Sequence, residues 1–182
     1  MLCAMYCVPD QPLPSVFLAL GSNLGDRAAY LHAAVAALRQ HPAVQLVAVS
    51  PVYESAAHVL SGQEQPDYLN AVVWLHTTLT PETLLDLCRR LEAAAGRQRT
   101  IRWAPRTLDL DVLAWDDLVR YDERLTLPHP RLAVRRFVLQ PWADLAPDFY
   151  VPAPFCATVA ELLHRCPDRA PLRRTGVSLK TR

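Results

Sequence analysis

The stretch Thr80-Pro81-Glu82-Thr83-Leu84-Leu85-Asp86-Leu87-Cys88-Arg89-Arg90-Leu91, which runs on to Gly96, predicts a helix with both ends marked. Thr80 suits the N-cap, Pro81 the first helical position and Glu82 the first turn. A buried stripe follows at helical spacing, made of Leu84, Leu87, Cys88, Leu91 and Ala95. Gly96 supplies the stop.

Strands are predicted on both sides of this helix, from Tyr68 to Thr77 and from Leu108 to Trp115. The first half of the chain has the same pattern. An apolar run over 15–20 predicts a strand buried on both faces, Asp26 caps a second helix, and Val44 to Tyr53 is rich in β-branched residues. The order predicts an α+β fold with a ferredoxin-like βαββαβ core, its sheet and helices layered α/β/α.

The end of the chain is less regular. Beyond residue 116 the sequence is rich in proline, and Thr158 to His164 predicts one more short helix. The expected organisation is an N-terminal extension over 1–14, one domain over 15–164 and a basic tail over 165–182.

Composition narrows the class of protein. The chain is 51% hydrophobic with a formal net charge of +1, so nothing in its overall charge calls for nucleic acid or a membrane surface. The five cysteines include no Cys-x-x-Cys pair, which disfavours a disulfide scaffold and a structural zinc site. No secretory signal and no run of about 20 apolar residues is present. We expect a soluble, cytoplasmic protein.

Two carboxylates stand at the head of the last predicted core strand. Asp109 and Asp111 are two residues apart, so their side chains share one face of that strand with Leu113 and Trp115. Like charges this close need a cation between them, and carboxylates favour Mg²⁺. The alternative is a strand start with two solvated acids paired to arginines.

An arginine-rich segment precedes these acids. Arg97, Arg99 and Arg102 lie between Gly96 and Pro105 together with Trp103, and Arg106 follows Pro105 directly. Guanidinium groups bind phosphate oxygens in pairs, so the segment predicts a lid that closes over a polyphosphate and excludes water. An exposed basic loop remains the alternative.

Other polar positions leave the choice open. Tyr68 and Asn70 project to one face of their strand and suit a flat heterocycle, or ordinary packing. The turn over 21–26 lacks the glycine and lysine pattern of a phosphate-binding loop. His129 stands between two prolines and either binds phosphate or caps a turn. Arg135 and Phe137 follow closely and either serve a site or are an ordinary surface residue and an ordinary core residue.

Four blocks in this order resemble the 6-hydroxymethyl-7,8-dihydropterin pyrophosphokinase family of folate biosynthesis. The blocks are Phe17-Leu18-Ala19-Leu20-Gly21-Ser22-Asn23-Leu24-Gly25-Asp26, Gln65-Pro66-Asp67-Tyr68-Leu69-Asn70-Ala71, Arg102-Trp103-Ala104-Pro105-Arg106-Thr107-Leu108-Asp109-Leu110-Asp111 and Leu127-Pro128-His129-Pro130. The resemblance runs from about residue 15 to about 164. It implies Mg²⁺-dependent transfer of pyrophosphate from ATP to the pterin hydroxymethyl group, with release of AMP, by a monomer.

The resemblance also implies residue roles. Asp109 and Asp111 would hold two Mg²⁺ ions, and Asp109 would also border the pterin. The residues expected to bind ATP are Arg97, Arg99, Arg102, Arg106, Arg124, Thr126, His129 and Arg135. The residues expected around the pterin are the rings of Tyr68 and Phe137, the amide of Asn70 and the lid residue Trp103. Arg97, Arg106 and the two aspartates would carry catalysis, and Glu92 aligns with a helix acid of undefined role.

Two functions of other classes compete. The first is a non-catalytic ferredoxin-like module that binds RNA or a regulatory ligand. An RNA-binding sheet would need an open aromatic face and a basic surface, which the near-neutral charge and paired acids disfavour. A two-metal nuclease or phosphatase would need water at its metals, whereas an arginine and tryptophan lid excludes water.

Overall fold

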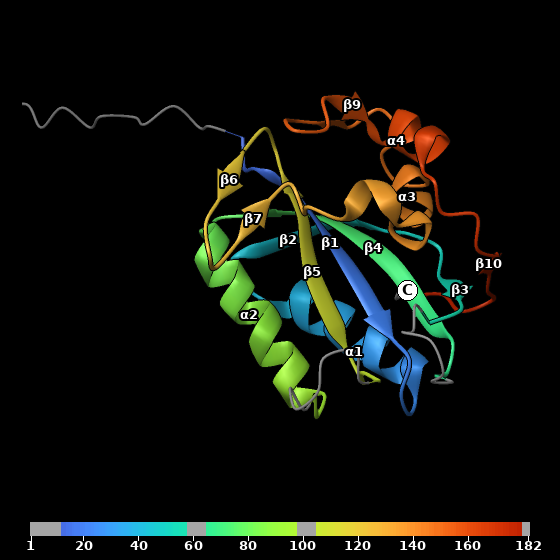
Figure 1. The fold of residues 1–182 in the computed structure, drawn as a ribbon. Coiled ribbons are helices and arrows are strands. Elements are labelled where there is room, and N and C mark those ends of the chain that lie inside the picture. Colours follow the sequence, from blue (N-terminus) through green and yellow to red (C-terminus); the bar gives the residue numbers. More distant parts are fainter. Residues whose placement is uncertain (1–11, 58–64, 98–104, 180–182) are drawn as a thin grey trace, which may run out of the picture.

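The computed structural model describes residues 12–57, 65–97 and 105–179. Arg99, Arg102 and Trp103 lie outside these ranges. Figure 1 shows the arrangement of the elements. In chain order they are β1 (Ser15–Ser22), α1 (Arg27–Gln40), β2 (Val44–Val49), β3 (Tyr53–Ser55), β4 (Tyr68–Thr77), α2 (Pro81–Ala94), β5 (Asp109–Trp115), β6 (Arg120–Tyr121), β7 (Thr126–Leu127), the 3₁₀ turn Leu132–Val134, α3 (Arg136–Ala143), β8 (Tyr150–Val151), β9 (Ala157–Thr158), α4 (Val159–Arg165) and β10 (Leu172–Arg174).

The main sheet has the predicted ferredoxin-like order. Within the described ranges it contains six strands in the order β10-β3-β4-β1-β5, and β2 also pairs with β4. Every pairing is antiparallel. β1 therefore lies in the interior of the sheet between β4 and β5, as expected for a strand that is apolar on both faces.

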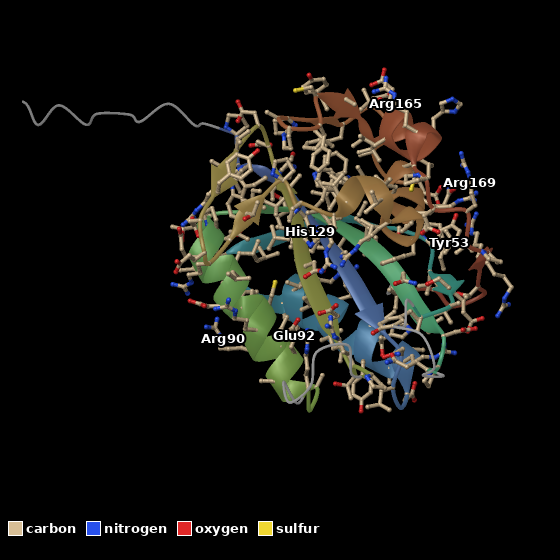
Figure 2. All side chains as sticks on the ribbon, in the orientation of Figure 1. Tyr53, Arg90, Glu92, His129, Arg165 and Arg169 are labelled. Carbon is tan, nitrogen blue, oxygen red and sulfur yellow. The ribbon has the colours of Figure 1, made fainter. Side chains whose placement is uncertain are left out.

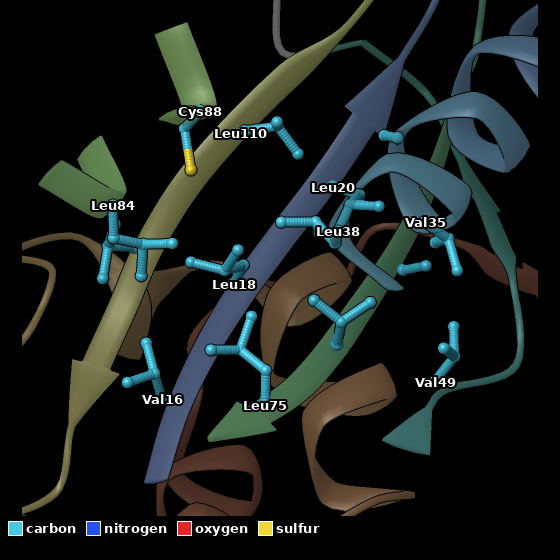
Figure 3. Packing of buried hydrophobic residues seen from close by; sticks show 14 of the residues in the cluster. Val16, Leu18, Leu20, Val35, Leu38, Val49, Leu75, Leu84, Cys88 and Leu110 are labelled. Atoms are coloured by element: carbon cyan, nitrogen blue, oxygen red, sulfur yellow. The ribbon is translucent and has the colours of Figure 1, made fainter. Parts of the chain in front are cut away.

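The two faces of β1 supply two separate hydrophobic clusters. Val16, Leu18 and Leu20 point to the face that α1 and α2 cover, where Cys88 of α2 is also buried (Figure 3). Phe17 points to the opposite face and stacks near Trp142 of α3, with ring centroids 5.1 Å apart. The helices thus lie on both sides of the sheet, which confirms the predicted α/β/α layering.

Both predicted helix starts are confirmed. The Asp26 carboxylate accepts the backbone N–H of Ala29 at 3.0 Å, and the Thr80 hydroxyl accepts that of Thr83 at 3.3 Å. Gly96, just past the end of α2, has φ +77°, a left-handed conformation that a side chain disfavours. This turn sends the chain from α2 toward Arg97.

The predicted strand over Val44 to Tyr53 is wrong as one element, because it is divided into β2 and β3. At the break, the Ser50 hydroxyl takes the place of a backbone group in the ladder. It accepts the N–H of Val72 at 2.9 Å and donates to the carbonyl of Pro51 at 2.7 Å. Pro51 has no N–H to continue the ladder.

Trp115 does not share a face with Asp109 and Asp111, which corrects the prediction. The register of β5 against β1 shifts beside Leu113, because Val112 pairs with Leu18 but Ala114 pairs with Phe17. The extra residue reverses the alternation, so Leu113 packs in the α3 cluster and Trp115 in the α1–α2 cluster.

The region beyond residue 116 is more ordered than its sequence indicates. It contains α3, which carries Pro141 inside it, and α4, close to the expected short helix. Part of the predicted basic tail, Leu172–Arg174, forms β10 and pairs with β3. Among the described residues, no helix combines the length and apolarity that a membrane crossing requires.

Candidate active site

Polar side chains gather where β1 ends, on the sheet face that α3 covers. Gly21 of β1 pairs with Asn70 of β4 on one side and with Asp109 of β5 on the other. A Cβ on Gly21 would lie 3.6 Å from a ring carbon of Tyr68 and 3.9 Å from the Cβ of Asp109. The bare glycine therefore keeps open the space between the aromatic and the acidic side of the site.

A cavity of about 580 Å³ occupies this end of the sheet. This volume lies in the range of small-molecule sites. The charged and polar residues that line it are Ser55, Gln65, Tyr68, Asn70, Arg89, Glu92, Arg97, Arg106, Asp109, Asp111, His129, Arg131 and Arg135. They come from β3, β4, α2, β5, the segments next to these elements and the segment before α3, so the fold assembles the site from distant parts of the chain.

Two arginines hold the carboxylate of Asp109. Arg97 Nη1 donates to its Oδ1 at 2.5 Å, and Arg106 Nη1 donates to its Oδ2 at 2.6 Å. The Asp109 side chain is 21% exposed and that of Arg97 only 11%. Burial disfavours the charge of Arg106, but the adjacent Asp109 raises the pKa of Arg106 above its ordinary value. The Arg106 guanidinium thus stays cationic beside the cavity.

Glu92 of α2 also belongs to this ion-pair network, because it shares Arg97 with Asp109. Its side chain is 4% exposed and accepts from Arg97 Nη1 and from the backbone N–H of Leu110, the latter at 2.9 Å. Leu110 stands between the two aspartates on β5, and β5 is an edge strand in the described sheet. Glu92 therefore satisfies a buried N–H that has no strand partner there. Glu92 and His129, both labelled in Figure 2, line the same cavity.

Asn23, directly after β1, fixes the chain that leads into β5. Its N–H donates to the carbonyl of Arg106 at 3.0 Å, and its Oδ1 accepts the N–H of Arg106 at 2.7 Å. Its Nδ2 donates to the carbonyl of Pro66 at 3.2 Å. Asn23 is 1% exposed, so the turn over 21–26 positions Arg106 and the segment before β4.

Asp111 faces a second group of basic side chains. Arg135 Nη1 lies 3.5 Å from Asp111 Oδ2, and His129 Nε2 lies 3.8 Å from the same oxygen. The His129 backbone N–H donates to Leu113 at 2.8 Å, and its Nδ1 accepts the N–H of Arg131 at 3.1 Å. Burial lowers the pKa of His129, Asp111 opposes this, and Arg135 and Arg131 add to it. A neutral His129 thus presents an Nε2–H donor to the cavity.

The other side of the cavity is aromatic and amide-bearing. The buried Asn70 donates Nδ2 to the hydroxyl of Ser55 at 3.0 Å. Tyr68, half-buried, has a pKa raised mainly by burial. Phe137 of α3 also lines the cavity, with the guanidinium carbon of Arg135 5.8 Å from its ring centroid. Two rings and a fixed amide suit a flat heterocycle with hydrogen-bonding edges.

Residues 17–147 match the family model described as 7,8-dihydro-6-hydroxymethylpterin-pyrophosphokinase (HPPK). The chain belongs to the HPPK family. It is 43% identical over 152 residues to the 2-amino-4-hydroxy-6-hydroxymethyldihydropteridine pyrophosphokinase of Pseudomonas aeruginosa, covering 84% of this chain and 91% of that protein. The enzyme of the same name from Bacillus subtilis is 44% identical over 129 residues, covering 71% of this chain and 76% of that one.

Solved HPPK-DHPS structures of Plasmodium falciparum have the same fold at low sequence identity. A triple mutant with pteroate matches with a TM-score of 0.65 at 12% identity over 86% of this chain. The wild-type protein matches with a TM-score of 0.61 at 11% identity over 87% of this chain. In both cases this chain spans 42% of the longer chain.

Most residues that the HPPK resemblance singled out lie together at the cavity. Those that line it are Tyr68, Asn70, Arg97, Arg106, Asp109, Asp111, His129, Arg135 and Phe137. Arg124 and Thr126 are not among the lining residues. Arg124 instead pairs with Asp86 on the outer surface of α2, at 2.7 Å, and Thr126 lies on β7. Both were expected on the nucleotide side.

Sequence reasoning did not assign a role to several residues of the HPPK site. Arg89 and Arg131 line the cavity as exposed cations, and Ser55 holds Asn70. Asn23 was considered only as part of a tight turn. The crowding of arginines around Arg89 was visible in the sequence, whereas Ser55 and Asn23 act through contacts across the sheet, which carry no local signal.

The donor set fits magnesium when phosphate is present. In the described part of the chain, no group of three or more His, Cys, Asp or Glu side chains is arranged to hold a metal ion. Asp109 and Asp111 both line the cavity, however, and Mg²⁺ is commonly held by one or two carboxylates with water and substrate phosphates. Arg97 and Arg106 occupy Asp109 here, so a metal would share or replace these contacts.

Proposed function

We propose that the cavity residues of this chain carry out the reaction of the HPPK family. The chain is a pyrophosphokinase that transfers pyrophosphate from ATP to 6-hydroxymethyl-7,8-dihydropterin, which gives AMP and the pterin diphosphate in folate biosynthesis. The observation that carries the residue assignment is the contrast between the two sides of one cavity. Acids and arginines line the β5 side, and Tyr68, Asn70 and Phe137 line the other.

Asp109 and Asp111 are the proposed ligands of two Mg²⁺ ions. Their side chains share one strand face and border the cavity, and Mg²⁺ held by one or two carboxylates completes its coordination with water and phosphate oxygens. When bound, the ions neutralise phosphate charge and polarise the hydroxyl group that attacks. Asp109 pairs with Gly21 and thus lies nearest the pterin side, which supports a second role there.

Arg97 and Arg106 are the proposed stabilisers of the transferred group. Each donates Nη1 to Asp109, and a guanidinium carries five N–H donors, so each can contact a carboxylate and a phosphate oxygen together. Both guanidinium groups already line the cavity, so their charges lie close to a bound phosphate before the reaction starts. His129 and Arg135, beside Asp111, are proposed to hold the triphosphate from the opposite side.

The sequence assigns further ATP contacts to Arg99, Arg102, Arg124 and Thr126. Arg99, Arg102 and Trp103 belong to the expected lid, which lies outside the described residues. Arg124 would have to exchange its contact with Asp86 for the nucleotide. We keep these residues as proposals on the family resemblance alone.

Tyr68 and Phe137 are the proposed rings on either side of the pterin, and Asn70 reads its edge. Ser55 accepts the Asn70 Nδ2–H and turns the amide oxygen toward the pterin's N–H donors. Arginines and acids line the rest of the cavity, so the side with Tyr68, Asn70 and Phe137 is the one suited to an uncharged heterocycle. We also propose a cytoplasmic monomer whose domain begins near residue 15.

The metal assignment is tested by calorimetry with Mg²⁺ and a non-hydrolysable ATP analogue. Asp111→Asn should weaken binding of the metal–nucleotide complex by at least about tenfold, since one charged ligand is lost. Asp117→Asn, an exposed aspartate just beyond β5, is the matched control. Equal affinity of Asp111→Asn and Asp117→Asn would contradict the assignment.

A further inference from the structure

The strand β10 lies outside the part of the chain that matches the HPPK family model, which ends at residue 147. It pairs with β3 in a regular register: Leu172 with Ser55, Arg173 with Glu54 and Arg174 with Tyr53. Figure 1 shows it at the edge of the sheet, beside β3. The end of the described chain therefore adds a strand next to residues of the site.

β10 changes the position of β3 in the sheet. β3 has three residues and pairs on its other side with β4, where Tyr53 faces Asn70 and Ser55 faces Tyr68. Without β10, β3 would be a very short edge strand with one open row of backbone groups. With β10 it is held from both sides, and it carries Ser55, whose hydroxyl accepts the Asn70 amide at 3.0 Å.

The segment after β10 is anchored to the body of the protein. The N–H and the hydroxyl of Thr175 both donate to the carbonyl of Val52, at 2.8 and 3.0 Å. Leu179 is 1% exposed and belongs to the cluster under α1 and α2, and Val177 packs against that cluster. Burial of a leucine contributes about 2 kcal/mol, so this segment is fastened and is not a loose tail.

A series of charged contacts links β10 to Asp67, the residue before β4. Glu54 of β3 accepts from Arg173 through Oε2 and from Arg27 through Oε1, and Arg173 is the main cause of the lowered pKa of Glu54. Arg27 also donates Nη1 to the carbonyl of Asp67 at 2.5 Å. One carboxylate thus joins β10 to the start of β4.

We propose that β10 is a positioning element for the pterin side of the site, an inference that rests on the proposed function. It holds β3 so that Ser55 orients Asn70, and it holds the start of β4 through Glu54 and Arg27. Among the described residues, those that line the triphosphate side belong to α2, β5, the segments next to these two elements and the segment around His129, and none belongs to β10. Loss of β10 therefore weakens pterin binding and leaves nucleotide binding unchanged.

The test compares four chains: the full chain, a chain ended after Pro171, Ser55→Ala, and both changes together. Circular dichroism checks the fold. Dissociation constants are measured for a non-hydrolysable ATP analogue with Mg²⁺ and, at saturating analogue, for 6-hydroxymethyl-7,8-dihydropterin by its fluorescence. Truncation should raise the pterin constant about tenfold, the value of one oriented hydrogen bond, and leave the nucleotide constant unchanged. In the Ser55→Ala chain, truncation should raise the pterin dissociation constant by a much smaller factor, because both changes act on the contact between Ser55 and Asn70.

If the truncated chain does not fold, the proposal is tested with the Arg173→Glu variant instead. Its matched control is Arg169→Glu, at an exposed arginine, and Arg173→Lys is the conservative variant. Arg173→Glu should weaken pterin binding about threefold, since it places two carboxylates together, while the other two variants should not. Equal changes in both dissociation constants, or no change in a folded chain, would overturn the inference. Pterin binding that weakens in the truncated chain as predicted, with no AMP formed by the full chain, would instead overturn the proposed function alone.

Discussion

Replacing Glu92 with glutamine removes the buried charge that holds the head of β5. The glutamine amide oxygen can still accept the N–H of Leu110, so the main loss is the charged contact with Arg97. Arg97 keeps its contact with Asp109, and the network of two acids and two arginines gains one unbalanced positive charge. The side chains of Glu92 and Arg97 are only 4% and 11% exposed, so water compensates little.

The size of the effect follows from these contacts. A hydrogen bond to a charged group contributes about 1.5–3 kcal/mol, and the surviving partner of Arg97 favours the lower half of this range. For a chain of this length, a loss of about 2 kcal/mol lowers the melting temperature by about 4–8 °C. Urea titration should show a lower midpoint with an unchanged slope, because the surface exposed on unfolding stays the same.

The assay is thermal and urea unfolding of wild type, Glu92→Gln and Glu123→Gln. Glu123 is an exposed glutamate between β6 and β7 and controls for the loss of a carboxylate. The control should differ from wild type by less than about 0.5 kcal/mol. A Glu92→Gln protein as stable as Glu123→Gln would show that the buried carboxylate does not fasten α2 to β5.

Three further predictions concern the site itself. Asp111→Ala should abolish AMP formation while the circular dichroism spectrum stays that of wild type, and near-normal turnover would exclude Asp111 as a metal ligand. Arg106→Ala should lower kcat by about 10²–10³ in steady-state assays, since one preorganised donor to developing charge is lost; a change in KM alone would contradict this role. Gly21→Val should raise KM for the pterin more than KM for ATP, because its added methyl groups enter the space beside Tyr68 and Asn70; equal effects on both would refute the placement.

The sequence predicted the core of the fold because its signals are local. Thr80 and Asp26 are capping residues, and the apolar run in β1 is too continuous for an exposed strand. The prediction from the sequence missed features that depend on contacts between residues far apart in the chain. The break between β2 and β3 depends on Ser50 bonding to Val72 of β4, and the changed face of Trp115 depends on a register shift against β1. No local pattern encodes either.

The same division holds for the candidate site. The spacing of Asp109 and Asp111 predicted one shared face, and the cavity borders both. The arginines were expected on phosphate, whereas Arg97 and Arg106 hold Asp109 in this structure. Their place depends on which anions are present, since a carboxylate and a phosphate compete for the same donors. β10 lay in a segment with little periodicity and forms only by pairing with β3.

The central claim is pyrophosphate transfer at this cavity, and its most direct test is product analysis. The full chain is incubated with ATP and Mg²⁺, with and without 6-hydroxymethyl-7,8-dihydropterin, and the nucleotides are separated by chromatography. We predict AMP and the pterin diphosphate in equal amounts, formed only when the pterin is present. ADP or free phosphate in place of AMP, or AMP formed equally without the pterin, would contradict the account.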